Sequence, residues 1–215
     1  MKYIFLTSVF LFAVLSLPAQ KYPEPEFSNE IYYLKKDSVH SLVRLEKSSA
    51  KMGTKTKAGG FGGMENGYFF DGEKSDVRLN NGANLSFVFS TGASGSARSS
   101  SSPQQDSMMR ANGVDPSMMS GMSGMHDPAN TVTLYKTDVG KGSRKILLQK
   151  VGGAFGSKKN QSSDKYLFSV KKIREGYWEL VIDKTLPKGE YAFNMMNMTT
   201  GNMDGSTTVF AFAVD

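Results

Sequence analysis

Short runs in which apolar and polar residues alternate are the feature that most constrains the fold. Leu85 to Ser90 alternates cleanly, and the run at 177–183 places Trp178, Leu180 and Ile182 on one face. A period of two residues is typical of a strand that packs one face on a core, whereas helical periodicity is rare in this chain. Further runs of this kind lie at 31–34, 42–45, 68–70, 77–79, 131–139, 146–151, 166–173, 191–196 and 208–214. The pattern predicts an all-β protein.

The C-terminal runs indicate which kind of β protein this is. Leu186-Pro187-Lys188-Gly189 has the proline and glycine of a tight turn, and Tyr191 follows it at the start of a strand. This spacing predicts a tyrosine corner, in which the hydroxyl bonds back across the turn before strand F. Phe210, Phe212 and Val214 would then face the core from the last strand. We therefore expect an immunoglobulin-like antiparallel β-sandwich.

Three segments carry a resemblance to a known group of proteins. They are Gly72-Glu73-Lys74-Ser75 ahead of a strand, the Pro-x-Gly-Glu-Tyr-Ala turn at Pro187–Ala192, and the aromatic C-terminal strand that ends in Val-Asp, Phe210–Asp215. In these segments the chain resembles a group of uncharacterised secreted bacterial β-sandwich (immunoglobulin-like) proteins. The resemblance covers roughly residues 67–91 and 131–215, and it implies a fold but no activity.

The N-terminal residues 1–19 have the three parts of a secretory signal peptide. Lys2 gives a positive start, Ile4 to Leu17 is an uncharged apolar run, and Ala19 is a small residue at the expected cleavage point. The run is short for a bilayer-spanning helix, and it ends in polar, proline-rich sequence, which disfavours a buried N-terminal helix. We expect an exported protein of the bacterial periplasm or cell surface.

The rest of the chain divides by composition. Residues 20–66 are expected to form an N-terminal hairpin, around Lys36-Asp37-Ser38, and a Gly-rich linker over 49–66. Residues 67–215 are expected to form the sandwich domain. Within it, residues 92–130 are rich in Ser, Gly and Met, which predicts a long, flexible, disordered loop.

Composition also disfavours several classes of protein. There is no cysteine, so neither disulfides nor thiolate chemistry are available. No second apolar run is long enough to span a bilayer, so after signal cleavage the chain is not expected to be an integral helical membrane protein. The formal net charge is +6, but the basic residues are scattered, which is more typical of a solvated sheet face than of a nucleic-acid-binding surface.

Clustered methionines are the one chemically suggestive feature. Thioethers are soft, neutral ligands that select Cu(I), and a histidine follows the first cluster directly. If 85–90 and 131–139 are strands B and C and the last two strands are F and G, the B–C and F–G loops open at the same end of the sandwich. Both clusters would then be neighbours in one site. The candidate metal ligands are Met118, Met119, Met122, Met125, His126, Met198 and Met203.

Three other interpretations of the methionines stay open: a sticky surface for a partner protein, adaptable packing, and a plain flexible linker. Catalysis has little support. His40 and His126 are the only histidines available to a Ser-His-Asp system, and no spacing singles out a pair of carboxylates. Glu73, Glu175, Glu179 and Glu190 are interpreted as turn or sheet-face residues.

The sequence therefore predicts a non-catalytic binding or structural module of the cell envelope, without a cofactor and with an envelope protein as its partner. The alternative is a periplasmic copper-binding protein that uses the clustered thioethers.

Overall fold

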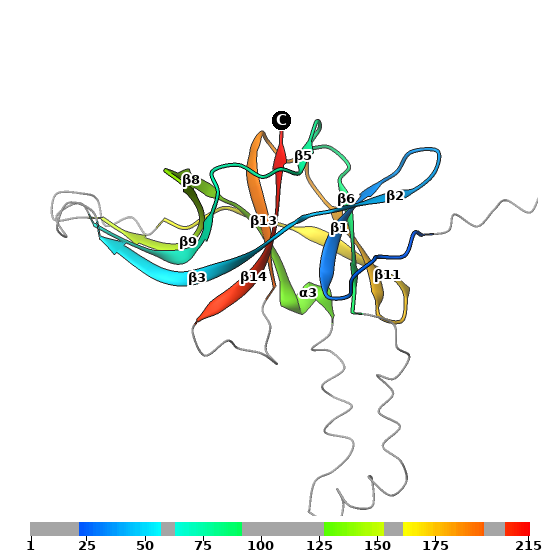
Figure 1. Cartoon of the computed structure of the whole chain (residues 1–215), viewed down its shortest axis with the longest axis horizontal. Helices are drawn as coiled ribbons and strands as arrows, with labels where there is room; N and C mark the ends of the chain where they lie inside the picture. The colour runs from blue at the N-terminus through cyan, green and yellow to red at the C-terminus, as the bar shows by residue number, and fades with distance from the viewer. Residues whose placement is uncertain (1–21, 57–62, 92–126, 153–160, 196–204) are drawn as a thin grey trace, which may run out of the picture.

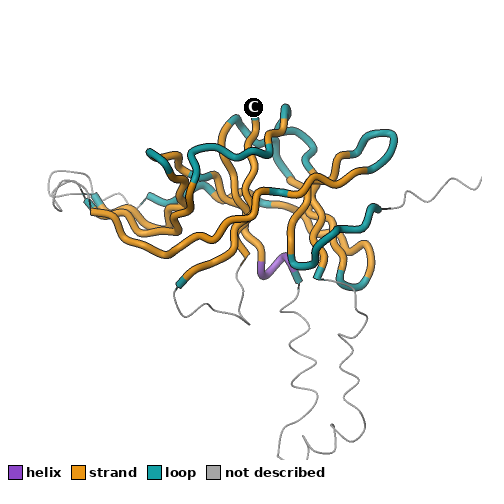
Figure 2. The backbone as a smooth tube through the Cα atoms, in the orientation of Figure 1, coloured by secondary structure: helices purple, strands orange, loops and turns teal. Residues whose placement is uncertain are grey.

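A computed structural model describes residues 22–56, 63–91, 127–152, 161–195 and 205–215. Most of these residues are in strands, which Figure 2 shows in orange. They form two β-sheets, in which every strand pair is antiparallel except that of β5 with β14. The predicted all-β sandwich is confirmed.

The first sheet has five strands in the order β11-β12-β6-β1-β2. They are β1 (Glu30–Lys35), β2 (Ser41–Arg44), β6 (Ser86–Ser90), β11 (Phe168–Arg174) and β12 (Tyr177–Ile182). The predicted N-terminal hairpin is present as β1 and β2, and β1 also pairs with β6. The hairpin is thus hydrogen-bonded into the sandwich.

The second sheet has nine strands, eight of them in the order β10-β7-β13-β14-β3-β4-β9-β8, with β5 (Arg78–Leu79) beside β14. The eight are β3 (Glu46–Thr56), β4 (Met64–Asp71), β7 (Val132–Lys136), β8 (Asp138–Gly140), β9 (Ser143–Val151), β10 (Lys165–Tyr166), β13 (Gly189–Met195) and β14 (Ser206–Val214). Figure 1 shows β13 and β14 in the middle of the molecule, between the five-stranded sheet and the β3–β9–β8 part.

The strand order follows the immunoglobulin pattern. Strands β1, β6, β12 and β11 correspond to A, B, E and D of one sheet, and β7, β13 and β14 correspond to C, F and G of the other. The strands expected from the sequence as B, C, F and G are therefore in those places.

The sandwich core lies between the two sheets and is aromatic. The Phe87 ring centroid is 4.9 Å from those of Phe193 and Phe212, and Trp178 stacks on Phe89 at 5.9 Å. The faces predicted for the runs at 177–183 and 208–214 are confirmed, because their alternate residues belong to this core. The predicted tyrosine corner is also present: Tyr191 Oη donates to the Pro187 carbonyl at 2.5 Å.

The nine-stranded sheet curls round on itself. Strand β7 pairs with β13, and one residue later, after Thr137, the same chain continues as β8 and pairs with β9. The strand order that begins with β7 and ends with β8 therefore closes on itself. It encloses the face of the nine-stranded sheet that is turned away from the sandwich core. Alanines at three strand centres, Ala50, Ala192 and Ala211, leave room there for Phe70 and Ile146. This second core was not expected from the sequence.

The structure differs from the expected linker over 49–66. Residues up to Thr56 belong to β3, which pairs with β14 and β4, and residues from Met64 belong to β4. Composition suggested a linker because most of the segment is Lys, Ser, Thr and Gly. A strand forms nevertheless, because Ala50 faces the enclosed core while the lysines on the opposite face remain in solvent.

A four-residue helix, α3 (Pro128–Thr131), is capped by Asp127, whose side chain accepts from the Ala129 N–H. The sequence placed residues 127–130 in the long loop; proline at the first helical positions and an aspartate cap favour the helical turn. Within the described part of the chain, no helix has the length and apolar character needed to cross a membrane.

Candidate functional site

The residues predicted to bind copper lie outside the described residues. They are Met118, Met119, Met122, Met125, His126, Met198 and Met203. The described flanks of the two Met-rich segments are adjacent, because Met195 at the end of β13 pairs with Val132 at the start of β7. Among the residues that the structure describes, no group of three or more His, Cys, Asp or Glu side chains is placed to hold a metal ion.

A buried ionic network inside the curled sheet was missed by the sequence analysis. Arg144 of β9 is fully buried and bonds to Glu46, to Glu190 at 3.5 Å and to the Gly72 carbonyl at 3.0 Å. Its guanidinium also lies 4.8 Å from the Phe70 ring centroid. A buried charge requires such partners, because desolvation without them is costly.

Segments far apart in the sequence meet at this network. Glu190 also accepts from the Ser75 N–H at 2.8 Å and pairs with Arg78, which in turn binds Asp215. The segments 72–75, 187–192 and 210–215 therefore converge on one buried glutamate. Glu190, expected on a sheet surface, is 7% exposed. Glu190 is buried and not on the surface, because the sheet curls over the strand face on which it lies.

The network positions β9, whose alternate side chains face opposite ways. Arg144 and Ile146 point inward, while Lys145 and Leu147 point to the outer face. Arg144 lies two residues before the apolar Ile146, so both side chains are on the same face of the strand. This spacing was the signal in the sequence for a buried arginine.

A β-bulge in β9 keeps its lysines on one face. Gly67 pairs with Leu147 and Asn66 with Gln149, so Leu148 is the extra residue. Lys150 consequently shares the outer face with Lys145 and lies opposite Glu65, instead of pointing inward. Gly67 is required at the bulge, because a Cβ there would lie 2.2 Å from the Ile146 carbonyl oxygen.

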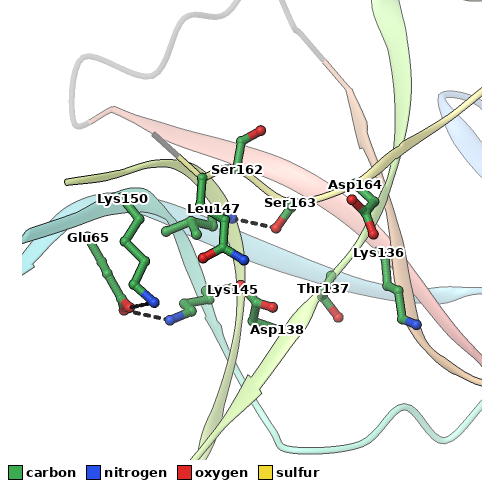
Figure 3. Close-up of a pocket in the computed structure, with 11 residues that line it drawn as sticks. Glu65, Lys136, Thr137, Asp138, Lys145, Leu147, Lys150, Ser162, Ser163 and Asp164 are labelled. Carbon is green, nitrogen blue, oxygen red and sulfur yellow. Dashed lines mark hydrogen bonds and ion pairs between the residues drawn. The ribbon is translucent and has the colours of Figure 1, made fainter. Parts of the chain in front are cut away.

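The outer face of this region contains an open polar pocket of about 320 Å³ (Figure 3). One wall is β9, and another is the bend from β7 into β8 at 136–138. The third wall is the segment 161–164, which bridges these strands. Ser163 exchanges hydrogen bonds with Leu147, and the Asp164 carbonyl accepts from the Lys136 N–H at 2.9 Å. The pocket, which we call the seam pocket, thus has a backbone-fixed frame.

Charged groups of both signs line the seam pocket. Glu65 is 4% exposed and binds Lys145 at 2.6 Å and Lys150 at 3.7 Å, as the dashed lines in Figure 3 show. These ammonium groups stabilise the ionised carboxylate and fix its position. Asp138 and Asp164 also line the pocket, and among the described residues neither carboxylate forms an ion pair.

Thr137 borders the seam pocket, but its hydroxyl is buried. Thr137 is 5% exposed, and its Oγ1 is inaccessible to solvent and has no hydrogen-bond partner among the described residues. The Thr137 N–H donates to the Glu190 carbonyl at 2.8 Å. A buried polar atom without a partner costs free energy, so the hydroxyl destabilises the fold at this point.

A second pocket of about 260 Å³ adjoins the seam pocket and shares Lys145 with it. Its lining is Lys55, Phe69, Gly140, Lys141, Ser143 and Lys145, which includes three lysines and no carboxylate. We call it the lysine pocket. No sequence motif marked either pocket, because their residues come from five separate segments.

A second polar cluster lies on the outer face of the five-stranded sheet. Glu179, expected on a solvated face, is 2% exposed and is bonded by Tyr22 at 2.8 Å and Lys36 at 2.7 Å. Burial alone would raise the pKa of Glu179, but these two partners outweigh it and lower the pKa. Burial and the bond to Glu179 raise the pKa of Tyr22 to about 12. The cluster holds the N-terminal segment against the sheet.

The lining of the seam pocket can hydrogen-bond a polar molecule from several sides, but it contains no histidine. His40 lies instead beside Tyr22, with 6.1 Å between ring centroids. Comparisons with protein-family models, with curated proteins and with solved structures found no match.

Proposed function

We propose that this protein is an exported, non-catalytic binding module of the cell envelope, and that its seam pocket binds a hydroxyl-rich molecule, a saccharide. The observation that carries the proposal is the backbone-fixed frame of this pocket, which is lined by carboxylate, amide, hydroxyl and ammonium groups.

The chemistry of the lining supports a saccharide. Sugar hydroxyls both donate and accept, so they need carboxylates, amides, hydroxyls and ammonium groups in combination. Asp138, Asp164, Gln161 and Ser162 supply carboxylate, amide and hydroxyl groups, and the lining lysines supply ammonium groups. Among the described residues, Leu147 is the sole apolar side chain in this lining, which disfavours an apolar small molecule.

The frame of the pocket supports binding without catalysis. Glu65 is held between two lysines, so it is poorly suited to exchange a proton with a substrate. The expected signal peptide supports export, and an envelope polysaccharide or an envelope glycoprotein is a suitable partner there.

A glycan array of bacterial envelope saccharides, followed by calorimetric titration, tests the proposal. Gln161→Ala removes a lining amide that can donate and accept, and we expect it to weaken saccharide binding by roughly two- to tenfold, the value of one net hydrogen bond. Gln149→Ala, at an exposed residue outside the pocket lining, is the matched control. Absence of any bound glycan, or equal affinity of Gln161→Ala and the wild type, would contradict the proposal.

One observation favours copper binding as a second candidate function. Met195 and Val132 are paired, so the two Met-rich segments join the fold at neighbouring points. Replacing Met118, Met119, Met122 and Met125 by Leu keeps the volume and removes the soft ligands. If Cu(I) titration under reducing conditions gives the same result for this variant and the wild type, the copper function fails.

A further inference from the structure

The lysine pocket next to the seam pocket indicates what kind of saccharide binds. We infer that the ligand is an acidic saccharide, whose hydroxyls occupy the seam pocket and whose acidic group is bound by Lys55, Lys141 and Lys145. This inference rests on the proposed function, because it assigns the chemistry of the same ligand.

The charge of the lysine pocket is the first argument. Three ammonium groups line about 260 Å³ of space, and no carboxylate is among the described lining residues. Like charges in close proximity repel, and a bound anion relieves that repulsion. Part of this charge is neutralised by Glu65, which reaches Lys145 from the side of the seam pocket.

The second argument is that two of these lysines are already positioned. Lys145 is fixed by Glu65 at 2.6 Å. Lys55 Nζ lies 4.4 Å from the Phe69 ring centroid, a cation–π contact. Phe69 itself packs over Gly53, where an added Cβ would be 3.3 Å from the ring. A preorganised pair of cations loses little side-chain entropy when an anion binds.

The continuity of the two pockets is the third argument. Lys145 belongs to both linings, and its register partner on β8 is Asp138, a seam-pocket residue. Two residues towards the N-terminus, Ser143 of the lysine pocket pairs with Gly140. A molecule that follows β9 from Lys150 to Ser143 therefore passes from the seam pocket, which is lined by groups of both charge signs, to the lysine pocket, whose described charged residues are all lysines. An acidic saccharide has this division between hydroxyls and acid.

Calorimetric titration with two matched probes tests the inference: trigalacturonate, and its fully methyl-esterified, uncharged counterpart. We expect the wild type to bind trigalacturonate roughly tenfold more tightly, since hydrogen bonds to charged groups are stronger than neutral ones. This preference is expected to shrink at high salt, because the lysine pocket is open to solvent.

Variants separate the two pockets. The double variant Lys55→Gln and Lys141→Gln is expected to bind both probes equally, with ester affinity unchanged. Gln161→Ala, in the lining of the seam pocket, is expected to weaken binding of both probes. Lys171→Gln, on the exposed face of β11, is the matched charge control and is expected to behave as the wild type. Thermal unfolding of each variant checks that the fold is retained.

The outcomes are distinguishable. If the wild type binds both probes equally, the inference is overturned and the proposed function stands. If neither probe nor any arrayed glycan binds, the proposed function itself fails. If inorganic phosphate binds as tightly as trigalacturonate and Gln161→Ala has no effect on either, the lysine pocket takes a free anion and the inference is overturned.

Discussion

Replacing Thr137 by Val is expected to stabilise the protein, which is unusual for a change at a buried polar residue. Thr137 is the single residue between β7 and β8, and it is 5% exposed. Valine has nearly the same shape and the same preference for extended backbone. The backbone bond from the Thr137 N–H to the Glu190 carbonyl, 2.8 Å long, does not involve the side chain and is retained.

The magnitude follows from the state of the hydroxyl. A buried polar group without a partner costs about 1–3 kcal/mol. Valine removes that cost and buries one additional methyl, which contributes about 0.8 kcal/mol. We use the lower part of this range and expect a gain of about 1–2 kcal/mol. For a chain of this size, 1 kcal/mol corresponds to a shift in Tm of roughly 2–4 °C.

Urea unfolding followed by circular dichroism measures the change. We expect a higher midpoint for Thr137→Val with an unchanged slope, which indicates a change in stability and not in the exposed surface. Thr137→Ser keeps the hydroxyl and loses the methyl, so its midpoint is expected to fall. A lower midpoint for Thr137→Val would refute the reasoning, because it would mean that Oγ1 has a partner in the folded protein.

Three further predictions concern the frame of the site. Arg144→Ala removes the buried guanidinium that binds Glu190 and Glu46, although Glu190 keeps its bonds to Arg78 and the Ser75 N–H, and it is expected to cost about 3–5 kcal/mol in urea unfolding; a loss below 1 kcal/mol, the ordinary range for a surface ion pair, would contradict the buried network. Gly67→Ala places a Cβ 2.2 Å from a carbonyl oxygen, so hydrogen exchange along β4 and β9 is expected to accelerate, with protection in β12 as the internal control. The pKa of Tyr22 is raised from 10.0 to about 12, so the contribution of Tyr22 to stability is complete below pH 10 and is lost as the pH rises through 12. The difference in unfolding free energy between wild type and Tyr22→Phe is therefore expected to shrink between pH 10 and 12. A constant difference would refute the link to Glu179.

Much of the fold could be predicted from local sequence. The alternation in 85–90 and 177–183 predicted strands and their buried faces, because the two faces of a strand differ in environment residue by residue. The Pro187–Tyr191 spacing predicted the tyrosine corner, since that motif is formed within five residues. These features depend on neighbours in the chain, so a single sequence contains them.

The strands over 49–66 and the burial of the glutamates required the tertiary structure. Polar residues in β3 are compatible with both a linker and a strand, and pairing with β14 and β4 decided between them. Glu179 and Glu190 lie in alternating strands whose outer faces looked solvated. They are buried because an N-terminal segment covers one face and a curled sheet encloses the other.

The sequence by itself determined an all-β chain, the immunoglobulin-like strand pattern and the absence of thiol chemistry. The tertiary structure decided which residues line the two pockets. Asp138, Lys145 and Lys55 come from separate segments, and they share one surface because β8 pairs with β9 and a bulge sets the register of β4 against β9. Alternation fixes which way a side chain points from its own strand, but only long-range pairing fixes which other strands it meets.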